Sequence, residues 1–189
     1  LDIIRRWADR FPFIRWLSEK DNGQSEAINK GFRLSSGEIV AWLNSDDTYA
    51  AGAVRRAAEF LAAHPDCMLA YSDAVIVDDW GAPIEIYPHT QKIFNYRRLA
   101  SVSDYIAQPS TFIRKKVLNE VGMLDEGLHW CMDWDLWIRI ADKHPVLYFP
   151  SLTARLRDYA QTKTRMGGRR RWMEIVSVAR KHSGQRFPP

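Results

Sequence analysis

The chain has 189 residues, of which 46% are hydrophobic and 26% are charged, and it carries a formal net charge of +4 at pH 7. This length and composition suit one globular domain with a sizeable core and exclude a disordered or low-complexity segment. No apolar run approaches the ~20 residues of a membrane span. The mild positive charge does not favour nucleic acid as a partner, because basic and acidic residues are mostly interspersed.

The two cysteines lie far apart in the sequence and match no metal-binding spacing. We therefore expect Cys67 and Cys131 to be buried free thiols, as in proteins of a reducing compartment. The chain opens with "LDIIRRWADRF", which predicts an amphipathic helix and contains no small-residue cleavage site of a signal peptide.

Strands and helices alternate along the first 80 residues. After a short predicted strand at 13–17, the pattern predicts a helix over roughly 24–34 and a near-continuously apolar strand over 38–43. A helix over 52–65 and a strand over 68–79 follow. This order predicts an α/β, Rossmann-like fold with a mostly parallel central sheet.

The remainder of the chain has a more mixed pattern. "IEIY" after a turn predicts a hairpin return, and the apolar stretches and turn residues predict further elements in this order: an extended segment at 106–114, a helix at 115–122, a helix at 132–144, a strand at 146–149 and a last helix at 169–182.

An abrupt change follows the strand at 38–43, where the sequence continues "NSDDTYAAGA". Two adjacent carboxylates, Asp46 and Asp47, repel each other unless a cation lies between them and an anionic ligand. Mg²⁺ or Mn²⁺ takes one or two carboxylates and completes its shell with water and phosphate oxygens. Asp46 or Asp47 would alternatively cap the helix that follows, and the residues alone leave both readings open.

The surroundings of this pair resemble a known family. Residues 18–54, "SEKDNGQSEAINKGFRLSSGEIVAWLNSDDTYAAGAV", resemble the family 2 glycosyltransferases, which have the GT-A fold. The resemblance implies a nucleotide-diphospho-sugar donor and a divalent metal, Mg²⁺ or Mn²⁺, held by Asp47 together with Asp46, or Asp46 instead on the ribose. Asn44 stands where the family's longer acidic motif begins. The residues that the resemblance places at the donor are Asp21, Gly23, Asn29, Lys30 and Asp46.

Residues 108–141 look like the acceptor half of the same family. In "QPSTFIRKKVLNEVGMLDEGLHWCMDWDLWIRIA", Asp133 occupies the position of the family's catalytic base, and Met132 stands where an acid is usual. An inverting transfer needs such a carboxylate to take the proton of the acceptor hydroxyl. The alternative for Asp133 is a helix-terminal role in the first turn. Asp135, assigned to the acceptor side, is also expected to pair with Arg139.

Three further side chains are candidates for contacts with the acceptor: Gln108, Ser110 and Trp130. Downstream, "LRDYAQTKT" resembles a family segment in which Tyr159 replaces the usual histidine. The basic stretch 165–173 is open to three readings, namely a flap over the diphosphate, a solvated loop, or an interfacial helix near anionic lipid.

We expect a single GT-A-like domain over 1–189, in which 1–80 is the donor and metal half, 81–164 the acceptor half, and 165–189 a basic loop with an amphipathic helix. By comparison with the family, a strand–helix–strand unit of roughly 30–50 residues is expected upstream of residue 1. Without it a sheet edge would be exposed, which favours a homodimer.

The predicted activity is therefore a metal-dependent, inverting transfer of a hexosyl or N-acetylhexosaminyl group from a nucleotide sugar to a glycan or glycolipid acceptor. The resemblance implies a role in cell-surface polysaccharide assembly, in the cytoplasm or at the cytoplasmic side of a membrane. The alternatives are a non-catalytic GT-A-like binding module or an inactive fragment. A hydrolase in which Asp47 and Asp133 flank a glycosidic bond is a third reading.

Overall fold

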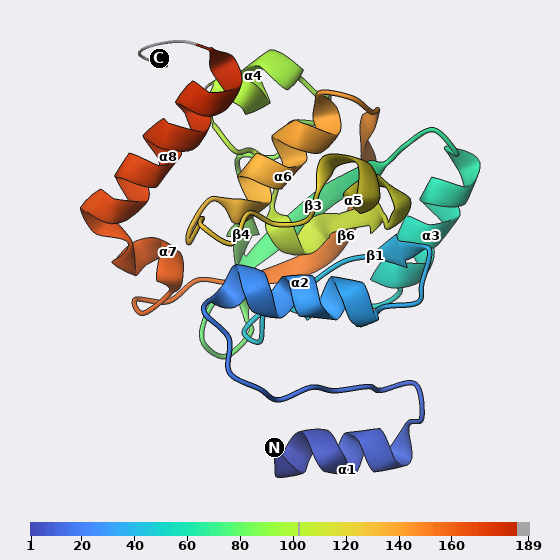
Figure 1. Ribbon diagram of the computed structural model, residues 1–189. Coiled ribbons are helices and arrows are strands. Elements are labelled where there is room, and N and C mark those ends of the chain that lie inside the picture. Colours follow the sequence, from blue (N-terminus) through green and yellow to red (C-terminus); the bar gives the residue numbers. More distant parts are fainter. Residues whose placement is uncertain (102, 185–189) are drawn as a thin grey trace.

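The computed structural model describes residues 1–101 and 103–184, so the end of the predicted 165–189 segment lies outside the described residues. A six-stranded sheet forms its centre, with strand order β1-β5-β3-β6-β2 and β4 paired to β3 (Figure 1). The strands are β1 (Ile39–Val40), β2 (Thr48–Tyr49), β3 (Leu69–Val77), β4 (Pro83–Ile86), β5 (Thr111–Arg114) and β6 (Val146–Arg157).

Helices surround this sheet at positions close to those that the sequence predicts. Gly122, with φ of 82°, ends the helix before it in the left-handed region that glycine favours. The helices are α1 (Asp2–Arg10), α2 (Gln24–Leu34), α3 (Ala53–Ala63), α4 (Tyr96–Ser101), the 3-10 helix η1 (Gln108–Ser110), α5 (Lys116–Val121), α6 (Met132–Ala141), α7 (Lys163–Met166) and α8 (Gly168–Ser183).

The α/β architecture is confirmed, but the prediction of a mostly parallel sheet is wrong. Only β3 and β6 pair in parallel, while the pairs β1–β5, β3–β5, β3–β4 and β2–β6 are antiparallel. A continuous apolar run reports burial on both faces of a strand, and it carries no information on the direction of the neighbouring strand. Since β5 is antiparallel to both of its neighbours, β1, β3 and β6 still run in the same direction.

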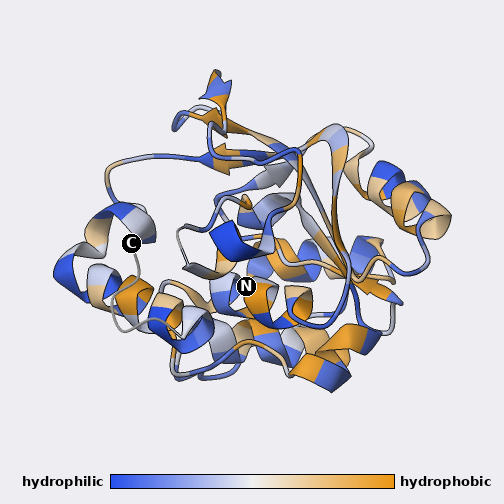
Figure 2. Cartoon of the chain, turned by 90° about the horizontal axis from the view of Figure 1, so that it is seen from above, coloured by the Kyte–Doolittle hydropathy of each residue, from blue (hydrophilic) through white to orange (hydrophobic). Residues whose placement is uncertain are grey.

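The sheet is covered on both faces. Leu69 and Tyr71 of β3 pack into the larger core, together with residues of α2, α4, α5, α6 and α8, whereas Ala70 between them faces a smaller core under α3. This alternation is the two-residue period of a strand. The helices carry alternating bands of hydrophilic and hydrophobic residues in Figure 2, as expected of helices with one face on a core.

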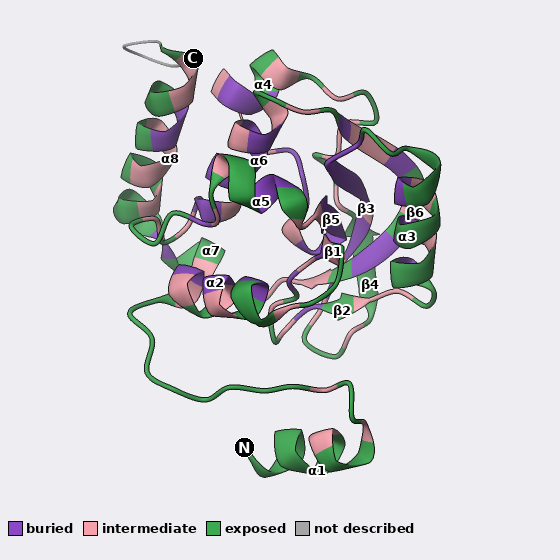
Figure 3. Cartoon of the chain, turned by 45° about the vertical axis from the view of Figure 1, so that its right-hand side comes forward, coloured by how far each residue is buried: buried purple, intermediate pink, exposed green. Residues whose placement is uncertain are grey.

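Two strand predictions at the start of the chain fail in different ways. Residues 13–17 form no strand, because none of the described segments pairs with them, and Phe13 is 80% exposed. The strand predicted over 38–43 is reduced to Ile39–Val40, beyond which the chain leaves the sheet and buries Trp42 against Trp137. Helix α1, which has no buried residue, lies apart from the rest of the fold (Figure 3).

Strand β6 is three times as long as predicted, and its length matters for the site. It continues past Pro150 to Arg157, which pairs with Val77 at the end of β3. Because β1 and β6 run in the same direction, the segment after β1 and the end of β6 meet at one edge of the sheet.

The two cysteines are free and buried, as expected from their spacing.

Candidate active site

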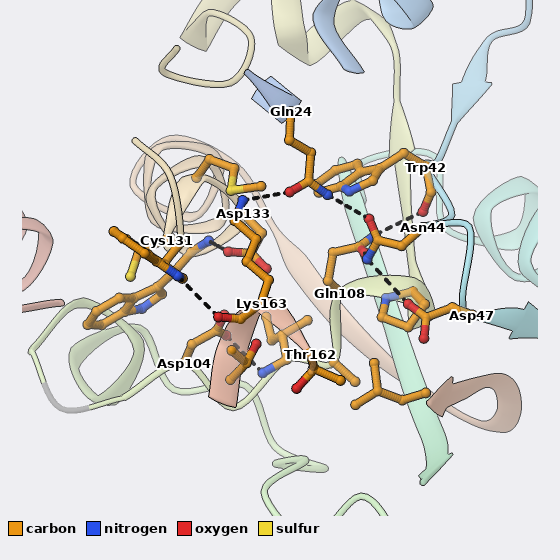
Figure 4. A pocket seen from close by; sticks show the side chains of 18 of the residues that line it. Gln24, Trp42, Asn44, Asp47, Asp104, Gln108, Cys131, Asp133, Thr162 and Lys163 are labelled. Atoms are coloured by element: carbon orange, nitrogen blue, oxygen red, sulfur yellow. Dashed lines mark hydrogen bonds between the residues drawn. The ribbon is translucent and has the colours of Figure 1, made fainter. Parts of the chain in front are cut away.

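A cavity of about 790 Å³ opens at the edge of the sheet where β1 and β6 end. Its lining comes from segments far apart in the sequence: the start of α2, residues 42–47 after β1, the loop before β5, residues 130–134 at the start of α6, the end of β6, and α7 with the first half of α8 (Figure 4). Asp46, Asp47 and Asp133 all line it. The two groups of carboxylates that the sequence singles out therefore face one cavity.

Asp46 and Asp47 are held by the end of β6. Asp47 is buried, and its Oδ1 accepts a hydrogen bond of 3.0 Å from the backbone amide of Arg157. The Nε of Arg157 donates to the backbone oxygen of Asp46 at 3.0 Å, and the hydroxyl of Tyr159 donates to Asp46 Oδ2 at 3.2 Å. The tyrosine that replaces the family's usual histidine thus contacts one of the paired acids directly.

Burial makes the ionised form of Asp47 costly. Burial raises the pKa of its carboxyl to about 6, and the charge of Asp46 adds to that rise, against hydrogen bonds from Arg157 and Asn44. Two adjacent carboxylates of this kind fit a hard divalent cation that completes its shell with water and phosphate oxygens. Within residues 1–101 and 103–184, no group of three or more His, Cys, Asp or Glu side chains is placed to hold a metal by itself.

A chain of hydrogen-bonded amides crosses the cavity. Lys163 Nζ donates to Gln24 Oε1 at 2.7 Å, and Gln24 Nε2 donates to Asn44 Oδ1 at 2.9 Å (Figure 4). The amide of Asn44 then donates to Asp47 Oδ2 at 3.3 Å and to Gln108 Oε1 at 3.0 Å. Asn44 therefore links the predicted metal residue to Gln108.

Asp133 lies in the first turn of α6, and its Oδ1 accepts a hydrogen bond of 2.8 Å from the amide of Trp134. Its side chain therefore binds one amide of the first turn and also faces the cavity. Burial raises the pKa of Asp133, although nearby amides and the positive charges of Lys163 and Arg171 oppose the rise.

Asp104 also lines the cavity, although no sequence motif marks it. Burial, and then the charge of Asp133, raise the pKa of Asp104 well above its ordinary value. Its Oδ1 accepts a hydrogen bond of 3.0 Å from the amide of Ile106. Since the residue lies in a loop without a motif, only its neighbours in three dimensions reveal it.

On the acceptor side, the structure brings Gln108 and Trp130 to the cavity but not Ser110 or Asp135. Ser110 is fully buried and donates to the backbone oxygen of Ala107, because it closes the turn of η1. Asp135 is also fully buried, on the face of α6 that packs against α8. Neither side chain lines the cavity, so the structure gives no support to an acceptor contact for these two residues.

The pairing of Asp135 with Arg139, expected from their four-residue spacing, is confirmed at 2.7 Å. Lys181 and His182 of α8 also donate to Asp135 Oδ1, at 2.9 and 2.8 Å. Burial alone would raise the pKa of Asp135, but these hydrogen bonds outweigh it and hold the pKa well below its ordinary value.

The predicted donor residues around the start of α2 have structural contacts. Asn29 is buried and exchanges hydrogen bonds with the backbone of Leu124, which is a structural contact. Lys30 Nζ pairs with Asp21 at 2.6 Å, and both lie in a second cavity of about 580 Å³ between residues 13–21 and α2. Gly23 is the N-cap of α2 and lines neither cavity. Donor contacts of Asp21, Gly23 and Lys30 stay predictions.

Comparison with solved structures identifies the class of fold. Two solved glycosyltransferase structures share the fold: the mannosyltransferase PcManGT from Pyrobaculum calidifontis in complex with GDP-Man and Mn²⁺ matches with a TM-score of 0.65 at 17% identity, over all of this chain and 52% of that one. S. aureus TarS in complex with UDP-GlcNAc matches with a TM-score of 0.63 at 16% identity, over 84% of this chain and 46% of that one. The fold is that of GT-A glycosyltransferases.

The family follows from the sequence comparisons. The model of glycosyl transferase family 2 matches residues 1–122, and the chain belongs to that family. Among relatives, it is 25% identical to the glycosyltransferase YwdF of Bacillus subtilis over 90% of this chain, and 23% identical to the amylovoran biosynthesis glycosyltransferase AmsE of Erwinia amylovora over 82%. It spans 64% of the length of YwdF and 58% of AmsE.

Proposed function

We propose that this chain carries the catalytic centre of a metal-dependent, inverting glycosyltransferase that uses a nucleotide-diphospho-sugar. One observation supports this most strongly: Asp46 and Asp47 line the same cavity as Asp133, which is about 87 residues further along the sequence and belongs to another element. A sugar bound between them would have its diphosphate at the paired acids and its anomeric carbon toward the base. PcManGT binds GDP-Man with Mn²⁺, and TarS binds UDP-GlcNAc.

Asp46 and Asp47 would hold Mg²⁺ or Mn²⁺, which would supply positive charge for the departing diphosphate. The fit rests on the donor set: two adjacent carboxylates, one of them buried with its pKa raised to about 6. Tyr159 and the Arg157 amide orient these carboxylates from the end of β6.

Asp133 would act as the base. The acceptor oxygen forms a bond to the anomeric carbon while the bond from that carbon to the diphosphate oxygen breaks, and the acceptor proton passes to the carboxylate of Asp133. Its raised pKa makes the carboxylate of Asp133 a stronger base than that of an exposed aspartate. Attack from the side opposite the diphosphate inverts the configuration at the anomeric carbon.

Gln108 and Trp130 would contact the acceptor. Trp130 is half-buried at the cavity wall, with its indole Nε1 donating to the backbone oxygen of Lys163 at 3.2 Å. An aromatic ring held in this way offers an apolar face to a sugar. The named roles of AmsE in amylovoran biosynthesis and of RfbC of Myxococcus xanthus in O-antigen biosynthesis favour a cell-surface glycan as the acceptor.

Peripheral contact with a membrane is supported by one exposed surface. Met166, Trp172 and Met173 are 72%, 64% and 52% exposed, and the exposed Arg169 and Arg170 lie between them. Apolar side chains flanked by arginines suit the surface of an anionic bilayer. No helix within residues 1–101 and 103–184 is long and apolar enough to cross a bilayer. A homodimer stays a prediction.

Nucleotide release tests the proposed activity. The chain is incubated with Mn²⁺ and either UDP-GlcNAc or GDP-mannose, with water as the acceptor, and UDP or GDP is measured. Asp133→Asn should lower the rate about 10³-fold, in the range expected for loss of a general base. Asp66→Asn, at an exposed turn, is the matched control and should keep the rate. Full turnover in Asp133→Asn would refute the assignment of Asp133 as the base. Nucleotide binding by the wild-type chain without nucleotide release would favour a non-catalytic module.

A further inference from the structure

Glu174 of α8 makes an unusual set of contacts at the acceptor side of the cavity. Its Oε1 accepts hydrogen bonds of 2.6 Å from the backbone amides of both Trp130 and Cys131, and its Oε2 accepts one of 2.9 Å from the amide of His129. Consecutive backbone amides that point to one place form a concave site for an anion. Here the protein's own carboxylate fills it.

This site lies next to the residue proposed as the base. Cys131 is the N-cap of α6 and has no side-chain hydrogen bond of its own to the helix, and Asp133 is two residues further on. Glu174 therefore fixes the backbone immediately before the turn that carries Asp133. Hydrogen bonds to an ionised carboxylate are shorter and stronger than those between neutral groups, which suits an anchor.

A second contact between α8 and α6 lies just beyond the base. Lys181 and His182 donate to Asp135 Oδ1, two residues after Asp133. The backbone on one side of Asp133 is thus held through Glu174 and the side chain on the other side through Asp135, and both anchors come from α8. Such a pair of anchors restricts the rotation and translation of the first turn of α6.

Close packing around Trp130 holds the same loop in place. A Cβ atom added to Gly167, just before α8, would lie 2.9 Å from Trp130 Nε1 and 2.5 Å from the Cβ of Arg171. The chain at Gly167 therefore approaches the indole as closely as a residue without a side chain allows. The same indole donates to Lys163 at the start of α7, so the segment 163–174 encloses the loop of residues 129–131.

We propose that Glu174 is a positioning residue, which holds the loop of residues 129–131 and through it sets the place of Asp133 in the cavity. The inference rests on the proposed function for its catalytic consequence, but the anchor itself is a property of the fold. Glu174 does not line the cavity and so does not act on the substrate directly.

Three variants separate position from charge. Glu174→Gln keeps the length of the side chain but replaces one acceptor by a donor, and Glu174→Asp keeps the charge but shortens the reach. Glu59→Gln removes an exposed glutamate of α3 and is the matched control. Thermal unfolding is measured for each, so that only folded variants are compared.

Two readouts are taken. In NMR, the amides of His129, Trp130 and Cys131 should exchange faster with solvent in Glu174→Gln and Glu174→Asp, and the Trp134 amide, which donates to Asp133, should change its chemical shift. In nucleotide release from UDP-GlcNAc and GDP-mannose with Mn²⁺, kcat should fall about 100-fold in both variants, because displacing a reacting group by about 1 Å costs this much. The Kd of the nucleotide sugar should not change.

The outcomes distinguish the inference from the proposed function. Unchanged exchange at residues 129–131, or an unchanged Trp134 amide, would overturn the positioning role whatever the activity. Faster exchange with an unchanged kcat would also overturn it, and so would a kcat retained by Glu174→Asp, because the effect would then follow the charge and not the position of the carboxylate. If the wild-type chain releases no nucleotide, the proposed function fails, and the NMR readout alone decides whether Glu174 positions Asp133.

Discussion

The backbone amide of Arg157 donates a hydrogen bond of 3.0 Å to Asp47 Oδ1, and these two residues are 110 positions apart in the sequence. The contact joins the segment after β1 to the end of β6, and so it fixes the paired acids at the wall of the cavity. It satisfies only part of the charge of Asp47, whose pKa remains raised to about 6. The remaining charge is the physical basis for the proposed cation.

Replacing Asp47 should make the protein without metal more stable. An acid whose folded pKa is raised to about 6 destabilises the fold as pH rises from about 4, where the unfolded carboxyl loses its proton, through 6. Asp47→Asn removes this penalty, so chemical denaturation in a chelator should give a gain on the order of 2 kcal/mol at pH 7 and none below pH 4. Adding Mn²⁺ should stabilise the wild type but not the variant. A variant less stable than the wild type at pH 7 would contradict the account.

The pH dependence of nucleotide release identifies which cavity aspartate is the base. Because burial raises the pKa of Asp133, the rate should fall with decreasing pH at values above the ordinary range of an aspartate. Burial and the charge of Asp133 raise the pKa of Asp104 well above its ordinary value, so we expect Asp104 to be the neutral acid beside an ionised Asp133. Asp104→Asn imitates that neutral acid and should retain the rate and its acid limb. Loss of activity in Asp104→Asn, with activity retained in Asp133→Asn, would exchange the two roles.

Asp135 should contribute stability, not catalysis. Removing one member of a buried ionic cluster leaves the others uncompensated, so Asp135→Asn should lower the free energy of unfolding by ~3 kcal/mol at pH 7. The folded pKa of Asp135 is lowered, so this stability is present above about pH 4 and is lost as pH falls further. Chemical denaturation at pH 7, 4 and 2 checks this. The difference in the free energy of unfolding between the wild type and the variant should become smaller at acid pH. A constant difference would mean that the carboxylate charge does not matter.

The surface of Met166, Arg169, Arg170, Trp172 and Met173 should bind anionic vesicles. Binding is measured by co-sedimentation with phosphatidylglycerol vesicles. The free energy of binding should become weaker by roughly 1 kcal/mol for each of Arg169 and Arg170 that is replaced by serine. Trp172→Ala should weaken it further, while Trp80→Ala, which removes an exposed tryptophan elsewhere, should not. Equal binding to neutral phosphatidylcholine vesicles, or no binding, would count against the membrane contact.

Local patterns predicted the elements that depend on local sequence. Helix α2 begins and ends at the predicted residues, because turn residues precede it and its apolar positions repeat with the helical period. The end of β6 was missed because Pro150 interrupts the apolar pattern. That proline lies where the register between β3 and β6 shifts, and a strand tolerates a residue without an amide hydrogen at such a bulge.

In the site, too, local motifs identify some residues, while residues that depend on distant partners are not identifiable from the sequence. Asp46, Asp47 and Asp133 could be singled out because the family resemblance marks them, and the structure brings all three to one cavity. Asp104 and Glu174 could not, because each acts through partners distant in sequence and neither belongs to a motif. Asp135 and Asn29 make structural hydrogen bonds that the sequence does not distinguish from ligand contacts, because both kinds of contact select the same polar residues.

Calorimetric titration of UDP and GDP, with and without Mn²⁺, tests the central claim most directly. If Asp46 and Asp47 hold a cation that binds the diphosphate, wild-type binding should require Mn²⁺ and should be lost in Asp47→Ala, while Asp133→Asn binds as the wild type does. Binding of equal strength without Mn²⁺, or undiminished binding by Asp47→Ala, would contradict the assignment of the paired acids.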